Sequence, residues 1–242
     1  MVVILNKKDV TVIIPAYNEE KTIAKIAEEV NAALSKKYPF LEILVMDDKS
    51  TDHTAQQVVA LQKKLPNVRL ITNKKNQGKT KTVLRGFSLT SAPILAFIDA
   101  DFQYFPKDLP KVISKVQEGY DICSGYRVNR HDALHRKVLS WGFNLVNRLL
   151  FNIRVRDVNC GLKAFNRESF KKIKLRYVTG PWFIDTEMLA RAVELNLKIA
   201  EVPINHDYRR EGKSRINMFS IVFETLGHAI LLKLELLFGR RR

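Results

Sequence analysis

The sequence predicts an α/β fold in which a mainly parallel sheet carries helices on both faces. Short apolar runs of strand length alternate along the chain with longer, amphipathic stretches of helix length. Strands and helices that alternate at this spacing form right-handed βαβ units, and these units build a parallel sheet. Because the chain has 242 residues, of which 46% are hydrophobic, we expect one large domain with appendages.

The apolar runs also give the order of the elements. Strands are expected at 10–16, 42–46, 68–72, 94–98 and 121–124, and later within KIAEVPINH at 198–206. Helices are expected at 19–37, 51–65, 79–90 and 107–118, and around 183–196. Residues 131–152 are expected to form a basic amphipathic helix inside a main domain over 1–216, and 217–242 an apolar terminal helix with an Arg-rich end.

Three of the predicted strands run into polar residues. In parallel sheets, ligands bind beyond the carboxyl ends of the strands, so these positions are the candidates for chemistry. They are Pro15, Tyr17 and Glu19 after the first strand, Asp48 after the second, and Asp99, Ala100, Asp101 and Gln103 after the fourth. We therefore expect one acidic site at a single edge of the sheet.

The segment from Asp99 to Gln103 is the candidate metal site. Its carboxylates and the amide oxygen of Gln103 are hard ligands, suited to Mg²⁺ or Mn²⁺ that bridges a diphosphate. The alternative is that the aspartates only form a turn and cap the helix that begins near Pro106.

Other candidates also have a structural alternative. A carboxylate at Asp48 suits a base edge or a ribose hydroxyl, whereas Tyr17 and Glu19 also suit a helix start. Gly78-Lys79-Thr80 lacks the earlier glycine of a phosphate loop, because that position is Asn73; it is equally typical of a solvated helix start.

The formal net charge of +16 leaves three classes of partner open, namely nucleic acid, an anionic membrane and a phosphorylated substrate. Two cysteines without metal-site spacing indicate a reducing compartment. The first residues do not read as a signal peptide, and no apolar run reaches the roughly 18 residues of a spanning helix. We therefore expect a cytosolic protein.

Two basic segments suit phosphate ligands. Arg136, Ser140, Asn144 and Arg148 recur at four-residue steps and form one stripe of the helix expected at 131–152. This helix suits a membrane interface, or else a surface helix that packs its apolar side on the core. Later, Arg209 and Arg215 lie in a loop whose guanidinium groups suit a diphosphate, and a solvated charge run is the alternative.

Nine motifs follow one another in a distinctive order: VIIPAYNEE, DDKSTD, NQGKTKTVLRG, DADFQ, SGYR, DVNCGLKAF, FIDTEMLARA, KIAEVPI and RREGKSR. Together they resemble the inverting family 2 glycosyltransferases of GT-A fold, and most closely the dolichyl-phosphate mannosyltransferase and polyprenyl-phosphate glycosyltransferase branch. The resemblance covers about residues 8–216, and DADFQ with the RxxGxS loop is its most specific part. Lys49, where the family often has Gly, and Arg215, where it commonly has Lys, depart from the pattern.

The resemblance implies roles for the matched residues. It assigns the nucleoside to Pro15, Tyr17, Glu19 and Asp48, the donor to Asp99 and Ala100, the metal to Asp101 and Gln103, donor or acceptor phosphates to Arg127, Arg209 and Arg215, and the lipid phosphate to Arg136 and Ser140. Within this set, the implied catalytic residues are Asp99, Asp101, Arg127 and Arg209.

The implied reaction is Mg²⁺- or Mn²⁺-dependent transfer of mannose or glucose from GDP-mannose or UDP-glucose to a polyprenyl (dolichyl) phosphate. It implies peripheral attachment at the cytosolic membrane face, with a small membrane protein as a further candidate partner. Because a phosphate monoester is largely ionised at neutral pH, such an acceptor needs no general base.

Two other functions remain open at this point. The first is transfer to a sugar hydroxyl of a lipid-linked glycan, for which Asp157 or Asp185 would be the candidate base. The second is a basic nucleic-acid-binding module. The positive charge gathers in 127–156, in 209–215 and at the terminus, a distribution that favours phosphate substrates at a membrane over nucleic acid.

Overall fold

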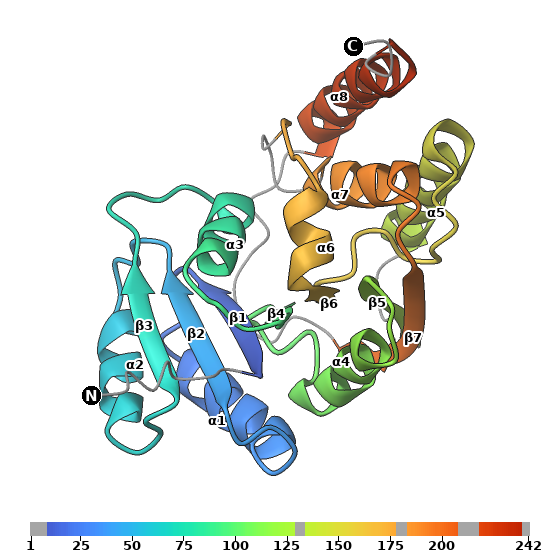
Figure 1. Ribbon diagram of the computed structural model, residues 1–242. Helices are drawn as coiled ribbons and strands as arrows, with labels where there is room; N and C mark the ends of the chain where they lie inside the picture. Colours follow the sequence, from blue (N-terminus) through green and yellow to red (C-terminus); the bar gives the residue numbers. More distant parts are fainter. Residues whose placement is uncertain (1–8, 129–133, 178–182, 208–217, 239–242) are drawn as a thin grey trace.

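The computed structural model describes residues 9–128, 134–177, 183–207 and 218–238, without the side chains of 134–139 and 218–226. Seven strands form one sheet in the order β3-β2-β1-β4-β6-β5-β7 (Figure 1). The strands are β1 (Val10–Ala16), β2 (Leu41–Asp47), β3 (Val68–Thr72), β4 (Ile94–Ile98), β5 (Ile122–Val128), β6 (Leu162–Asn166) and β7 (Ile199–Asn205). Every pairing is parallel except those of β6, which runs antiparallel between β4 and β5. The predicted mainly parallel sheet is confirmed.

The strand β6 was not expected from the sequence. The second of its five residues is Lys163, which the register places opposite Phe97 of β4 and Ser124 of β5. With a lysine and an asparagine among its residues, and no Val or Ile, the run lacks the pattern by which buried strands are recognised. The antiparallel direction has a further consequence, because the chain enters β6 at the edge where its neighbours end.

Helices cover both faces of the sheet. They are α1 (Ile23–Leu34), α2 (Thr54–Gln62), α3 (Lys79–Ser88), α4 (Leu109–Gln117) after the 3₁₀ turn η1 (Pro106–Asp108), α5 (Leu134–Phe151), α6 (Arg167–Lys172), α7 (Phe183–Glu194) and α8 (Met218–Phe238). The expected helices are each found, two to four residues shorter at several ends. The short helix α6 was not expected.

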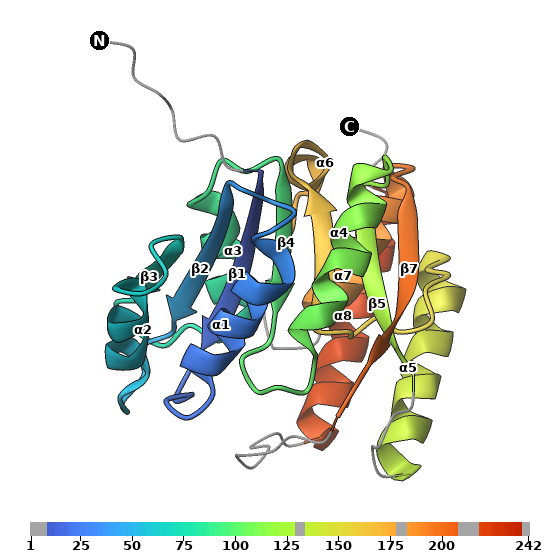
Figure 2. The same ribbon diagram turned by 90° about the horizontal axis from the view of Figure 1, so that it is seen from below.

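The alternation of side chains along the strands divides the core in two. Val12 and Ile14 face a core completed by α1, α2 and α4, while Ile13 faces a second core completed by α3, α5, α7 and α8. Figure 2 shows α1, α2 and α4 in front of the sheet and α7 and α8 behind it. Both faces are buried, as a parallel sheet requires.

Helices α5 and α8 belong to the second half of the molecule. In Figure 2 both extend past the edge where β5 and its parallel neighbours end. They contact each other and α7, and Lys233 Nζ of α8 donates to the carbonyl of Leu150 of α5 at 2.6 Å. Among the described residues, neither these helices nor any other is long and apolar enough to cross a membrane.

Both cysteines lie in the core, and neither forms a disulfide. Burial raises the pKa of Cys123 and of Cys160 to about 12, so at pH 8 both thiols are protonated and unreactive. We expect iodoacetamide to leave the native protein unlabelled at pH 8 and to label both cysteines after unfolding in guanidinium chloride. Mass spectrometry of the intact chain measures this, and a labelled native thiol would contradict the buried positions.

Candidate active site

Three strand ends converge at one edge of the sheet, as the sequence predicts. Two to four residues after β1, β2 and β4 lie Asn18, Lys49 and Phe102, whose φ angles of 57°, 64° and 57° are left-handed. Such a backbone is unfavourable for most residues and natural for glycine, which explains why glycine suits the position of Lys49. Each strand therefore leaves the sheet in a sharp turn, and the polar residues of the turns stay at the edge.

Of the candidate residues at the end of β1, some lie at the surface and some form the turn into α1. Tyr17 is exposed and Pro15 is half-buried. Glu19 Oε2 accepts from Thr22 Oγ1 at 2.8 Å, and the amide of Glu19 donates to Thr54 Oγ1 at 2.8 Å. Glu19 thus forms the turn that leads into α1, and Tyr17 presents an aromatic side chain at the edge. Their nucleoside contacts stay predictions.

Asp48 organises the loop that leads into α3. Its buried carboxylate accepts hydrogen bonds from Asn73 Nδ2 at 2.7 Å and from the amides of Gln77 at 2.9 Å and Gly78 at 2.7 Å. A carboxylate that accepts several amide hydrogen bonds is held in one position. Asp48 therefore fixes the backbone before Lys79, and any contact with a nucleoside adds to this role.

Asp99 of the DADFQ motif pairs with Lys79 at the start of α3. Lys79 Nζ lies 2.5 Å from Asp99 Oδ1. Burial alone would lower the pKa of Lys79, but the charges of Asp99, Asp185 and Asp101 raise it above the usual value. The sequence predicts either a weak anion contact or a solvated helix start at Lys79. The structure shows that this lysine belongs to the acidic site.

Asp101 and Gln103 come from a single turn, in which Asp101 Oδ1 accepts from the amide of Gln103 at 3.1 Å. Within the described residues, no group of three His, Cys, Asp or Glu side chains is arranged around a metal. A magnesium ion on a nucleotide commonly takes one or two carboxylates and completes its shell with phosphate oxygens and water. The oxygens of Asp99, Asp101 and Gln103 fit a metal ion of this kind, for which the phosphate oxygens of a nucleotide supply further ligands.

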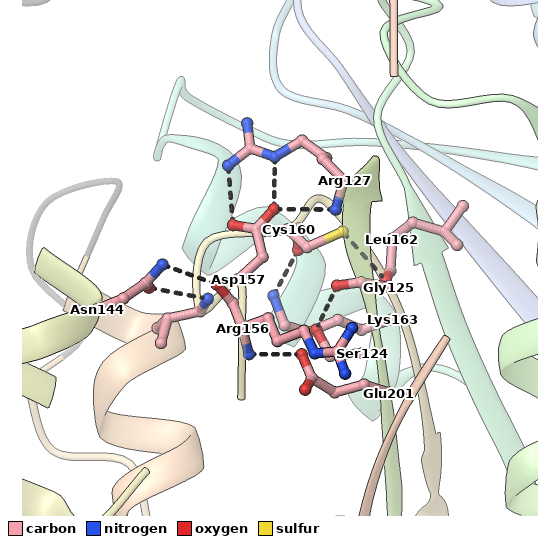
Figure 3. Close-up of polar contacts among 11 residues, drawn as sticks. Ser124, Gly125, Arg127, Asn144, Arg156, Asp157, Cys160, Leu162, Lys163 and Glu201 are labelled. Carbon is pink, nitrogen blue, oxygen red and sulfur yellow. Dashed lines mark hydrogen bonds and ion pairs between the residues drawn. The ribbon is translucent and has the colours of Figure 1, made fainter. Parts of the chain in front are cut away.

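Arg127 at the end of β5 forms a paired ion contact with Asp157 (Figure 3). Arg127 Nε and Nη2 donate to the two oxygens of Asp157 at 2.6 and 2.8 Å. Burial acts to lower the pKa of Arg127, but its hydrogen bonds to Asp157 raise it, so the guanidinium is held charged. The fork geometry fixes the plane of the guanidinium group.

The loop before β6 carries Asp157 and is anchored by α5. Asn144 Nδ2 donates to the carbonyl of Arg156 at 2.8 Å, and Asn144 Oδ1 accepts from the amide of Val158 at 3.3 Å (Figure 3). Asn144 belongs to the polar stripe predicted on this helix. The stripe therefore faces the loop of the candidate site at this position.

Lys163 and Asp185 form a further ion pair at the candidate site. Lys163 Nζ donates to Asp185 Oδ1 at 2.8 Å, and Lys163 is fully buried. Residue types alone gave no signal for Lys163, because it lies inside a strand and not after one. Its place in the DVNCGLKAF motif was the only available signal.

The remaining predicted residues are only partly covered by the structure. Arg136 lies in the first turn of α5, outside the described side chains, and Ser140 is half-buried on the same helix. Arg209 and Arg215 lie outside the described residues. Ala100, between Asp99 and Asp101 in the sequence, is buried.

A mainly parallel sheet with an acidic DADFQ turn at the carboxyl edge defines a GT-A type of protein. The chain belongs to the family described as "Glycosyl transferase family 2", whose model matches residues 11–174. The family expected from the motifs is thereby confirmed.

Curated relatives match most of this chain. The chain is 30% identical over 218 residues to the undecaprenyl-phosphate 4-deoxy-4-formamido-L-arabinose transferases of Salmonella paratyphi A and Salmonella dublin. These matches cover 89% of this chain and 64% of each relative, so the chain spans somewhat less than two thirds of their length.

Solved structures share the fold. Glucosyl-3-phosphoglycerate synthase from Mycobacterium tuberculosis, in complex with Mn²⁺, UDP-glucose and phosphoglyceric acid, matches with a TM-score of 0.70 and 20% identity over 93% of this chain and 79% of that chain. The same enzyme with Mg²⁺ and UDP matches with a TM-score of 0.67, over 95% and 79%. At this identity, the likeness shows the GT-A fold alone.

Proposed function

We propose that this protein transfers a hexose from a nucleotide diphosphate sugar to a polyprenyl phosphate. The family, the acceptor named in its curated relatives and the acidic edge of the sheet support this proposal. Mannose from GDP-mannose and glucose from UDP-glucose are the two donors to be tested.

The observation that favours a phosphate acceptor is the state of the two candidate bases. A sugar hydroxyl needs a carboxylate that can take its proton. Asp157 accepts hydrogen bonds from Nε and Nη2 of Arg127, and Asp185 is paired with the buried ammonium of Lys163. A sugar hydroxyl would have to compete with these cations for the carboxylate oxygens. An ionised lipid phosphate needs no such base.

Charge stabilisation then accounts for the chemistry. Asp101 and Gln103, with Asp99 beside them, are the residues that would hold a divalent metal ion, which when bound neutralises charge on the diphosphate. Arg127 lies at the end of β5, where its guanidinium is fixed by Asp157. In this proposal it faces a phosphate group. The attacking oxygen approaches the anomeric carbon opposite the leaving diphosphate, which gives inversion.

A radiochemical assay tests the proposal. The protein is incubated with Mn²⁺, a polyprenyl phosphate and either labelled GDP-mannose or labelled UDP-glucose. We expect one donor to give an organic-soluble sugar phosphate that mild acid cleaves. Absence of this product with both donors would overturn the assignment, and label appearing only on an added lipid-linked glycan would favour the hydroxyl acceptor.

Attachment to a membrane surface is part of this proposal. On α5, Trp141, Leu145 and Leu149 lie at four-residue steps, and Trp141 and Leu149 are 68% and 75% exposed. On α8, one face exposes Ile230, Leu231, Leu234, Leu237 and Phe238. Apolar helix faces on a strongly basic protein suit an anionic bilayer.

We expect Trp141→Glu/Leu149→Glu to lower the fraction of protein that sediments with vesicles containing phosphatidylglycerol by about tenfold, because apolar burial and charge attraction both weaken. Val59→Glu is the matched control, since Val59 is an exposed apolar residue on α2, away from α5 and α8. Vesicle co-sedimentation measures both proteins. Equal sedimentation of the double variant and the wild type would show that α5 does not bind the membrane.

A further inference from the structure

Lys163 is an ammonium group placed in the middle of the sheet. It is 0% exposed, and it lies in β6 between Phe97 of β4 and Ser124 of β5. Burial of a charge is costly, and a buried ion pair is often no more stable than apolar residues of similar volume. Stability alone therefore does not account for a lysine at this position.

The ammonium of Lys163 joins three parts of the site. It donates to Asp185 Oδ1 in the first turn of α7 at 2.8 Å and to the carbonyl of Cys160 in the loop before β6. It also lies 5.9 Å from the centroid of the Phe97 ring. The ammonium of Lys79 lies 5.7 Å from the centroid of the same ring. Two lysines thus share one aromatic ring beneath the acidic edge.

The loop held by Lys163 packs directly on Asp99. Gly161, next to Cys160, approaches Asp99 so closely that a Cβ at this position would overlap Asp99 Oδ2 and lie 2.6 Å from Tyr104 Cε2. On the other side, Asp99 Oδ1 is held by Lys79 at 2.5 Å. The position of Asp99 therefore depends on Lys79 and on the backbone that Lys163 fixes.

We infer that Lys163 is a positioning residue for the donor site. Its ammonium holds Asp185 and the Cys160–Gly161 peptide in place, and this peptide sets where the Asp99 carboxylate meets the donor. The inference rests on the proposed function, in which Asp99 lines the donor. It adds Lys163, a residue with no access to solvent, to those that determine donor binding.

The test is the donor KM of Lys163→Met, in which an apolar side chain of similar length fills the space. We expect the donor KM to rise about tenfold, as is typical when a residue that orients a ligand-binding group is lost. A residue needed only for folding would lower kcat through the folded fraction and leave the donor KM unchanged. That result would overturn the inference.

Two further variants sharpen the comparison. Arg191→Met removes a cation from another buried pair in α7, Arg191 with Glu187 at 2.8 Å, and should leave the donor KM unchanged. Asp185→Asn keeps an oxygen that accepts from Lys163 and should raise the donor KM less than Lys163→Met does. An equal rise would show that Asp185 acts on the donor directly, and the role given to Lys163 would be wrong.

Two conditions keep the result separate from folding and from the proposed function. If Lys163→Met does not fold, Lys163→Met/Asp185→Leu removes both charges and should fold with the donor KM still raised; a wild-type KM in this variant overturns the inference. If the wild type transfers no sugar, the proposed function fails by itself. Calorimetric binding of UDP and of GDP with Mn²⁺ then replaces KM, and a Kd equal in Lys163→Met and wild type overturns the inference.

Discussion

Replacement of Asp101 by asparagine is expected to lower the rate of sugar transfer by about 10²- to 10³-fold, because the proposed metal ion, which would neutralise charge on the leaving diphosphate, would lose its charged ligand. The asparagine oxygen can still accept from the amide of Gln103, which in the wild type donates to Asp101 Oδ1 at 3.1 Å. The turn is thereby preserved, and the loss reports on the charge. Initial rates measured across a Mn²⁺ titration should show a higher metal requirement.

The matched control for Asp101→Asn is Glu118→Gln. Glu118 is an exposed carboxylate that follows the last residue of α4 and is paired with Lys115 at 2.6 Å. Its rate and Mn²⁺ dependence should equal those of the wild type. A rate for Asp101→Asn within twofold of the wild type would remove Asp101 from the metal site and would return the DADFQ segment to a simple turn.

Replacement of Arg127 by methionine is expected to cause two separate losses. Asp157 would remain buried without its cation, which should lower the free energy of unfolding by about 3 kcal/mol. The variant would also lack the charged guanidinium that, in the proposed function, faces a phosphate group. We therefore expect kcat/KM to fall by about 10²-fold. Denaturant unfolding and steady-state kinetics measure the two effects.

The double variant Arg127→Met/Asp157→Leu separates stability from catalysis at this pair. Because both charges are removed, we expect most of the lost stability to return, while the activity stays low. Recovery of activity together with stability would mean that Arg127 serves the fold and does not contact a phosphate.

Much of the fold was accessible from sequence because it depends on local periodicity. The strands β1 and β4 lie at the predicted residues, since each is a largely apolar run with polar or turn residues at both ends. The acidic edge followed from the rule that ligands bind beyond the ends of parallel strands. Asp48, Asp99 and Asp101 were found in this way.

The remainder depends on contacts between residues that lie far apart along the chain. Nothing local shows that Lys79 turns towards Asp99, or that Arg127 is paired with Asp157. The search after each strand also could not find Lys163, because β6 runs against its neighbours and brings the beginning of a strand to the edge. The two candidate bases, Asp157 and Asp185, are ion-paired with Arg127 and Lys163. Pairing between residues so far apart leaves no periodic pattern in the sequence.

The reversed direction of β6 also brings the loop that follows α5 to the side of Asp99. Helix α5 ends at Phe151, and the loop that follows reaches Gly161, where the backbone touches Asp99, before β6 begins. Asn144 ties this loop back to the same helix. The exposed apolar face of α5 and the Asp99 carboxylate are thus connected through one short loop, which Asn144 holds by two hydrogen bonds.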